Sequence, residues 1–126
     1  MNIYHALIIC LGDDIEEEVT LSINGIELTC FSSICPYDLH KGEIYPVLLE
    51  IMIFDEYQVS ELGGGVVGLE RIGNDFSYWI TGRLDKGEVD CGIRFEDEIL
   101  LSNYGYMDGK LIKLKVDRID VEFLQR

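Results

Sequence analysis

The sequence predicts an all-β protein that folds as a small Greek-key barrel or half-open barrel, with at most one or two short helical turns. Short segments that alternate polar and apolar residues recur along the chain with turn signals between them, whereas no segment keeps a 3.6-residue period over three helical turns. At 126 residues with 48% hydrophobic composition, the chain can bury the core of one domain, so we expect a single domain over residues 1–126.

The first predicted element is a β-hairpin. Alternating segments over Glu18–Ile23 and Ile26–Phe31 are separated by Asn24-Gly25. Both turn residues tolerate the positive φ angles of a type I′ turn, which is the turn that joins two strands through a two-residue loop. The sequence therefore predicts two antiparallel strands joined at this turn.

A long strand is expected next, over Gly42–Phe54, because this segment is rich in Ile, Val, Leu and Tyr. Pro46 lacks an N–H, which predicts an edge position, a strand start or a bend at that point. We expect Tyr57–Leu62 to pair back on this strand. Three consecutive glycines then interrupt the pattern before a further short strand over Val66–Arg71.

A second hairpin is predicted from strands over Phe76–Leu84 and Glu88–Phe95. Asp85-Lys86-Gly87 would form a three-residue loop between them, with the glycine in a left-handed conformation. Two short segments are the best helical candidates. Asp13–Val19 is short and densely acidic, and Glu96–Leu101 has room for a single turn.

The pattern of the C-terminal strand changes its phase. In Leu111–Val116 the inward apolar set falls on even positions, and in Ile119–Phe123 it falls on odd positions. A strand of period two cannot exchange its buried face without an extra residue, so a β-bulge or sharp bend is predicted at Asp117-Arg118. Such a bend lets one long strand serve both sides of a small barrel. We therefore expect a barrel of the OB type, which has five curved strands.

Acidic residues dominate the charge of the chain, with 24 Asp and Glu against 10 Lys and Arg and a formal net charge of -14. Residues 1–70 contain most of this excess, since they hold 13 acidic side chains and only Lys41 as a basic one. The charge repels phosphate backbones and anionic membranes, which argues against nucleic-acid and membrane binding, and it attracts basic proteins. The expected binding residues are Asp13, Asp14, Glu16, Glu17, Glu18, Asp55, Glu56 and Glu61.

Cysteine and histidine give only weak candidates for a metal or catalytic site. Cys30, Cys35 and His40 have the spacing C-x4-C-x4-H, which departs from the pattern of structural zinc sites, so we predict no metal and no cofactor. Cys35 and His40 could also act as a nucleophile and its base, but no protease or nucleophile-elbow signature surrounds them. No catalytic residue is therefore predicted.

The thiols and the apolar segments predict the compartment. Cys10 and Cys91 lie in apolar or alternating segments, where a free cysteine acts as a small apolar side chain, so reduced cysteines are expected. The apolar segment Ala6–Leu11 is short and lacks a preceding Lys or Arg, and the longest apolar stretch is broken by a proline and a glutamate. We expect a soluble protein of the cytoplasm.

Three functions remain open from the sequence. We expect a small acidic, non-enzymatic binding protein that recognises another protein, favoured if basic, in the manner of an inhibitor or immunity protein whose carboxylates mimic phosphate. The first alternative is a small-ligand-binding or structural barrel that forms homo-oligomers through an exposed strand edge. The second is an enzyme with a Cys/His or carboxylate site.

Overall fold

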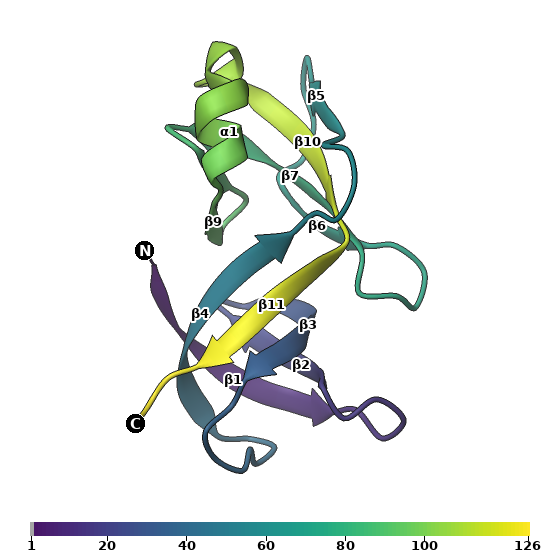
Figure 1. Ribbon diagram of the computed structural model, residues 1–126, viewed down its shortest axis with the longest axis vertical. Helices are drawn as coiled ribbons and strands as arrows, with labels where there is room; N and C mark the ends of the chain where they lie inside the picture. Colours follow the sequence, from purple (N-terminus) through teal and green to yellow (C-terminus); the bar gives the residue numbers. More distant parts are fainter. Residues whose placement is uncertain (1) are drawn as a thin grey trace.

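Two connected β-sheets make up the computed structural model, which describes residues 2–126 (Figure 1). One sheet closes into a barrel with the strand order β1-β2-β3-β11-β4. Its strands are β1 (Ile3–Leu11), β2 (Glu18–Ile23), β3 (Ile26–Ile34), β4 (Ile44–Met52) and β11 (Arg118–Phe123). β4 returns to lie beside β1, which is the Greek-key order, and β3 pairs in parallel with β11. The predicted all-β Greek-key barrel is confirmed.

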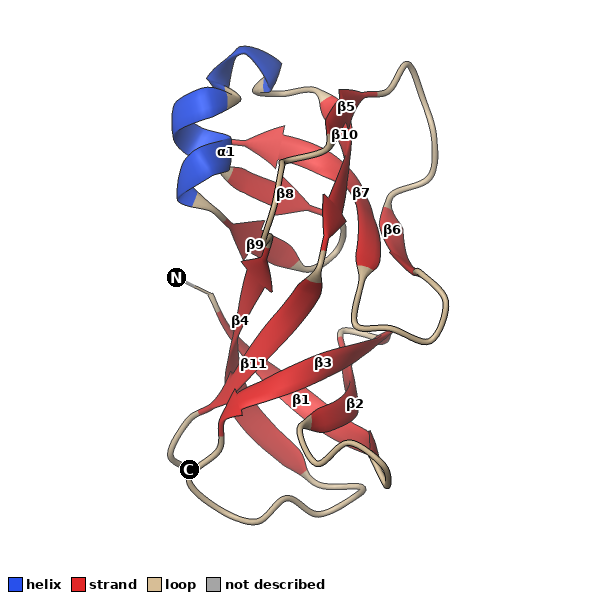
Figure 2. Ribbon diagram, turned by 45° about the vertical axis from the view of Figure 1, so that its right-hand side comes forward, coloured by secondary structure: helices blue, strands red, loops and turns tan. Residues whose placement is uncertain are grey.

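The second sheet is formed by the chain between β4 and β11, and it lies beyond one end of the barrel (Figure 2). Its strand order is β5-β10-β7-β8-β9, and β6 also pairs with β7. Its strands are β5 (Val59–Glu61), β6 (Gly68–Arg71), β7 (Tyr78–Asp85), β8 (Glu88–Asp90), β9 (Arg94–Glu96) and β10 (Leu111–Val116). A short helix, α1 (Glu98–Asn103), and a 3-10 turn, η1 (Gly105–Met107), pack beside this sheet.

The first hairpin forms as the sequence predicts. β2 and β3 pair in register from Glu18 opposite Phe31 to Ile23 opposite Ile26. Asn24 and Gly25 have φ angles of 53° and 80°, as a type I′ turn requires.

The second hairpin departs from the prediction at two points. Its loop has two residues rather than three, because Asp85 pairs with Glu88, and Lys86 and Gly87 both have positive φ angles, of 50° and 81°. The strand predicted up to Phe95 also breaks after Asp90, since Gly92 has a φ of 101° and its N–H donates to the Asp90 carboxylate at 3.0 Å. β9 therefore folds back onto β8 as a separate strand.

Two further predictions were wrong. β5 pairs with β10 and not with the strand that precedes it, because β4 already has β1 on one side and β11 on the other. Asp13–Val19 contains a bend, a turn and the start of β2 rather than a helix, and the Gly12 N–H donates to the Glu18 carbonyl at 2.9 Å to close this loop. The short helix predicted near Glu96–Leu101 is confirmed as α1, which Asp97 caps through the Leu100 N–H.

The phase change near the C-terminus is also confirmed, and it explains how the two sheets connect. β10 is a central strand of the second sheet, β11 is a barrel strand, and only Asp117 separates them. Ile112, Leu114 and Val116 are buried on even positions, and Ile119, Val121 and Phe123 are buried on odd positions. One nearly continuous strand thus supplies apolar side chains to both sheets. No helix within residues 2–126 is long and apolar enough to cross a membrane.

An acidic groove as the candidate functional site

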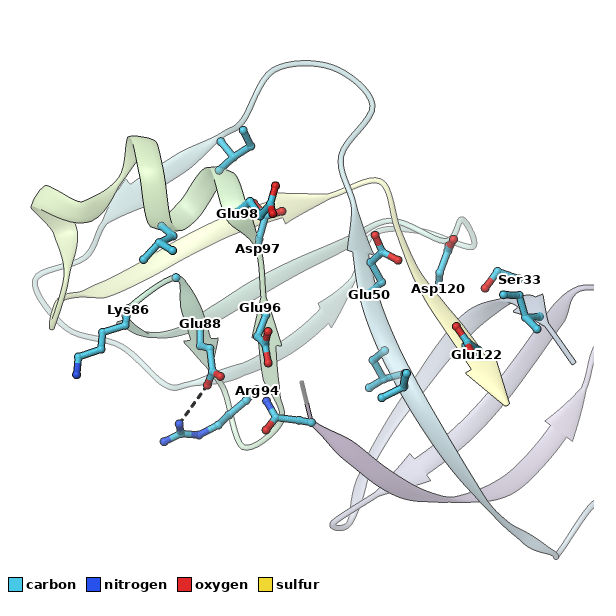
Figure 3. Close-up of a pocket in the computed structure, with 17 residues that line it drawn as sticks. Ser33, Glu50, Lys86, Glu88, Arg94, Glu96, Asp97, Glu98, Asp120 and Glu122 are labelled. Atoms are coloured by element: carbon cyan, nitrogen blue, oxygen red, sulfur yellow. Dashed lines mark hydrogen bonds and ion pairs between the residues drawn. The ribbon is translucent and has the colours of Figure 1, made fainter. Parts of the chain in front are cut away.

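A groove of about 1070 Å³ lies between the barrel and the second sheet (Figure 3). Its barrel wall comes from the end of β3, from β4 and from β11, and its other wall comes from β8, β9 and the start of α1. The wall residues reach the groove because β11 leaves the second sheet at Asp117 and turns toward β4. The bend in the C-terminal strand therefore creates the angle in which the groove lies.

Carboxylates outnumber cations in this groove. Figure 3 shows acidic side chains on both walls, with Glu50, Asp120 and Glu122 on barrel strands. The acidic residues that line the groove are Glu50, Glu88, Glu96, Asp97, Glu98, Asp120 and Glu122, and the cationic ones are Lys86 and Arg94. The groove is thus strongly acidic.

Arg94 is already engaged by the carboxylates around it. Its guanidinium lies 3.1 Å from the Glu88 carboxylate and 3.4 Å from that of Asp90. The hydrogen bond that Arg94 donates to the Glu88 carboxylate, followed by the charge of Asp90, raises the pKa of Arg94 above its ordinary value. Arg94 therefore compensates the negative charges of Glu88 and Asp90 on β8. It does not compensate the carboxylates of the barrel wall.

Two of the groove carboxylates have structural roles. Asp120 is only 7% exposed, and its Oδ1 lies 2.6 Å from Nε of Arg118, whose guanidinium also stacks 4.0 Å above the ring of Phe31. Asp97 accepts the Leu100 N–H at the start of α1. These two carboxylates hold the walls of the groove in place.

Three other carboxylates have no such partner. Within residues 2–126, no Lys or Arg side chain forms an ion pair with Glu50, Glu98 or Glu122. Glu50 and Glu98 are exposed and Glu122 is half-buried. Their charges face solvent in the groove, where they are available to a cationic ligand.

Apolar side chains lie among these carboxylates. Ile34, Ile99 and Leu101 line the groove with exposed fractions of 54%, 37% and 58%, and Leu48 and Leu49 extend this apolar surface along β4. Exposed apolar side chains beside charged groups are typical of a surface that binds another macromolecule.

The structure places the acidic residues predicted from sequence elsewhere. Asp13, Asp14, Glu16 and Glu17 belong to the β1–β2 connection, which lies at the end of the barrel away from the second sheet (Figure 1), and Glu18 begins β2. Asp55 and Glu56 follow β4, and Glu61 ends β5. None of these eight residues lines the groove. The predicted acidic residues therefore form two separate groups rather than one surface.

Sequence analysis missed the groove carboxylates because most of them come from the second half of the chain. That half has almost as many basic as acidic residues, so its net charge gave no signal. Glu88, Glu96 and Glu98 do cluster around the predicted second hairpin and helix, and this local acidity was the available signal. Only the folded arrangement brings them opposite Glu50 and Glu122.

A second cavity, of about 800 Å³, brings together part of the predicted cysteine and histidine set. Cys35 and His40 line it with Glu16, Glu17 and Glu18. Cys30 is instead fully buried inside the barrel, where burial and then the charge of Asp120 raise the pKa of its thiol. Within residues 2–126, no group of three His, Cys, Asp or Glu side chains is placed to hold a metal ion. Cys30, Cys35 and His40 are thus not brought together.

Comparison with known proteins gives one result. The chain belongs to the family described as "Uncharacterised conserved protein UCP019853", whose model matches residues 1–124. No match is found among curated proteins or among solved structures.

Proposed function

We propose that this member of the UCP019853 family is a non-enzymatic binding protein whose acidic groove takes a basic segment of another protein. The observation that carries the proposal is a groove with exposed apolar side chains on both walls, beside three carboxylates that form no ion pair with Lys or Arg within residues 2–126. A partner segment with Lys or Arg beside apolar residues would match both features. The apolar contacts would supply affinity, and the carboxylates would supply orientation and association rate.

We further propose that the barrel is of the OB type and that the protein works in the cytoplasm. The OB assignment is supported by the five-stranded closed order and by the parallel pairing of β3 with β11. The cytoplasmic assignment is supported by four free cysteines, of which Cys30 and Cys91 are buried. A reducing compartment keeps such thiols free.

The test uses a capped peptide with the alternating sequence Lys-Val-Lys-Val-Lys-Val-Lys as the basic probe. In one variant, Glu50→Gln, Glu98→Gln and Glu122→Gln remove three charges from the groove. In the matched control, Asp13→Asn, Asp14→Asn and Glu16→Gln remove three charges from the exposed β1–β2 loop. Both variants change the net charge equally, so only position distinguishes them.

We expect the groove variant to weaken peptide binding about tenfold at low salt, since three exposed ion pairs contribute roughly 0.2–1 kcal/mol each. At physiological salt the loop variant should change the affinity much less than the groove variant, because charges beyond about 8 Å are then screened. Isothermal titration calorimetry at low and high salt measures both effects. Equal losses in the two variants would mean that the peptide senses only net charge, and stronger loss in the loop variant would move the site to the β1–β2 loop.

A further inference from the structure

We propose that two copies of this chain associate through the free edge of β6, which pairs with β6 of the second copy in antiparallel fashion across a two-fold axis. This inference stands on a different part of the molecule from the groove and does not depend on the proposed function. Three observations support it: which backbone groups of β6 point away from β7, the apolar residues that precede β6, and the protection of the other edges of the second sheet.

The first observation is that β6 has a strand partner on one side only within residues 2–126. The Ile72 N–H donates to the Ser77 carbonyl at 2.9 Å and continues the β6–β7 ladder, so the even-numbered residues exchange hydrogen bonds with β7. The N–H and C=O groups of Leu69 and Arg71 therefore point away from β7. Figure 2 shows β6 at the margin of the molecule, on the side away from α1.

The second observation is the apolar sequence that leads into this edge. Val66 is 89% exposed and Val67 is 49% exposed, directly before β6 begins at Gly68. Both are β-branched residues that favour strands. An open edge beside exposed apolar residues invites strand pairing, and natural proteins avoid such edges unless a partner covers them.

The other two edge strands of this sheet are protected. β5 has only three residues and exposes Ser60 and Glu61. On β9, the Arg94 N–H donates to the hydroxyl of Tyr4 at 2.8 Å, so a barrel side chain covers that edge. Charged residues, short strands and covering side chains are the usual means of blocking an edge. β6 is short and carries Glu70 and Arg71, so the exposed valines that precede it are what distinguish this edge from the other two.

A second copy suits this edge because its sequence is self-complementary. In the register centred on Gly68, Val67 lies opposite Leu69 of the second copy and Val66 lies opposite Glu70. Glycine at the axis lets the strands meet without a side-chain clash, and no carboxylate faces another. The edge is also less acidic than the rest of the chain, since Arg71 pairs with Glu18 at 3.5 Å. Such an isologous contact closes as a dimer.

The proposed dimer leaves the acidic groove accessible. The groove is built from α1, β9 and the barrel strands, and α1 lies on the opposite side of the second sheet from β6 (Figure 2). Each copy would therefore present its own groove.

The first test compares two edge prolines by sedimentation equilibrium. Val67→Pro removes the N–H of an odd-numbered residue, which points away from β7. It leaves the hydrogen bonds between β6 and β7 intact. Glu61→Pro is the matched control on the edge of β5, where the Leu62 N–H bonds the Leu111 carbonyl, so that odd-numbered residues face outward there too. We expect wild type and Glu61→Pro to dimerise below about 100 µM and Val67→Pro to need at least about tenfold more protein. A monomeric wild type, or equal weakening by both prolines, would overturn the proposal.

The second test fixes the register. Even-numbered residues of the proposed pair are not hydrogen-bonded to each other, so their Cα atoms lie about 4.5 Å apart, within the range that a disulfide spans. In a Cys10→Ser, Cys35→Ser background, the double variant Val66→Cys, Glu70→Cys should form a covalent dimer under mild oxidation. Val66→Cys alone should not. A wild-type dimer without this cross-link would place the interface elsewhere and contradict the proposal.

Discussion

The phenol oxygen of Tyr78 accepts a hydrogen bond from the backbone N–H of Thr29 at 2.7 Å, and both residues are buried. Thr29 lies in the section of β3 that pairs with β2 alone, because β11 joins β3 only from Phe31 onward. A side chain from β7 thus satisfies a barrel N–H where no strand is available. This contact ties β7 of the second sheet to β3 of the barrel.

Replacing Tyr78 with phenylalanine should destabilise the protein. Tyr78→Phe leaves the Thr29 N–H buried without a partner, which costs about 1–3 kcal/mol. The free energy of unfolding from urea titration measures the loss. Tyr106→Phe is the control, since Tyr106 is exposed and should change stability by less than about 0.5 kcal/mol. Equal stability of both variants would mean that the Tyr78 hydroxyl is not the partner of Thr29.

Stability should also fall at alkaline pH. Burial raises the pKa values of Cys30, Tyr57 and Tyr78, and a hydrogen bond to Asp97 raises that of Tyr57 further. The folded state therefore holds these protons to higher pH than the unfolded state. The stabilisation is complete below the unfolded pKa values, near 8.5 for cysteine and 10 for tyrosine, and is lost as the pH rises through and above them.

Urea midpoints measured from pH 7 to about pH 11 give this dependence. We expect a steady loss of stability from about pH 9 upward, and a shallower loss in Tyr78→Phe because one of the titrating groups is gone. A midpoint that stays constant over this range would show that these groups ionise equally well in the folded protein.

Much of the fold could be predicted because its signals are local. Asn24-Gly25 specifies a turn by itself, and the phase change around Asp117 identifies the bend from the alternation of neighbouring residues. The partner of β5 could not be predicted in this way. Its pairing with β10 depends on β4 being occupied on both sides, which is a property of the whole sheet order.

The candidate site was harder to predict than the fold. Glu50 on β4 and Glu98 on α1 belong to opposite walls of the groove, and no spacing rule relates them. The acidic β1–β2 loop gave a stronger sequence signal, because its carboxylates are consecutive. The distribution of charge along the sequence therefore identifies an acidic loop. It does not identify the groove, because the groove forms only through the angle between the two sheets.

The ion pair between Arg118 and Asp120 should support the barrel wall of the groove. Arg118→Met leaves the nearly buried Asp120 carboxylate without its cation, and we expect a loss of about 2 kcal/mol, less than for a fully buried pair because Arg118 is partly exposed. Adding Asp120→Asn to this variant should recover part of the loss. Urea titration gives the free energies of unfolding of the wild type, the two single variants and the double variant, which together form a double-mutant cycle. Additive effects would mean that the two side chains do not interact.

Two glycines make a matched pair for testing how closely β7 and β8 pack. A Cβ atom at Gly82 would lie 2.5 Å from the Asp90 carbonyl oxygen, whereas a Cβ at Gly105 would meet no atom within 4 Å. Gly82→Ala must therefore push β8 away from β7, and we expect a loss of about 2–3 kcal/mol. Gly105→Ala should be neutral or stabilise slightly, because alanine restricts the unfolded chain. Thermal unfolding measures the stability of both variants. Because Asp90 precedes the turn to β9, which lines the groove, Gly82→Ala should also weaken peptide binding in the groove. Equal melting temperatures would contradict the close approach of β8 at Gly82.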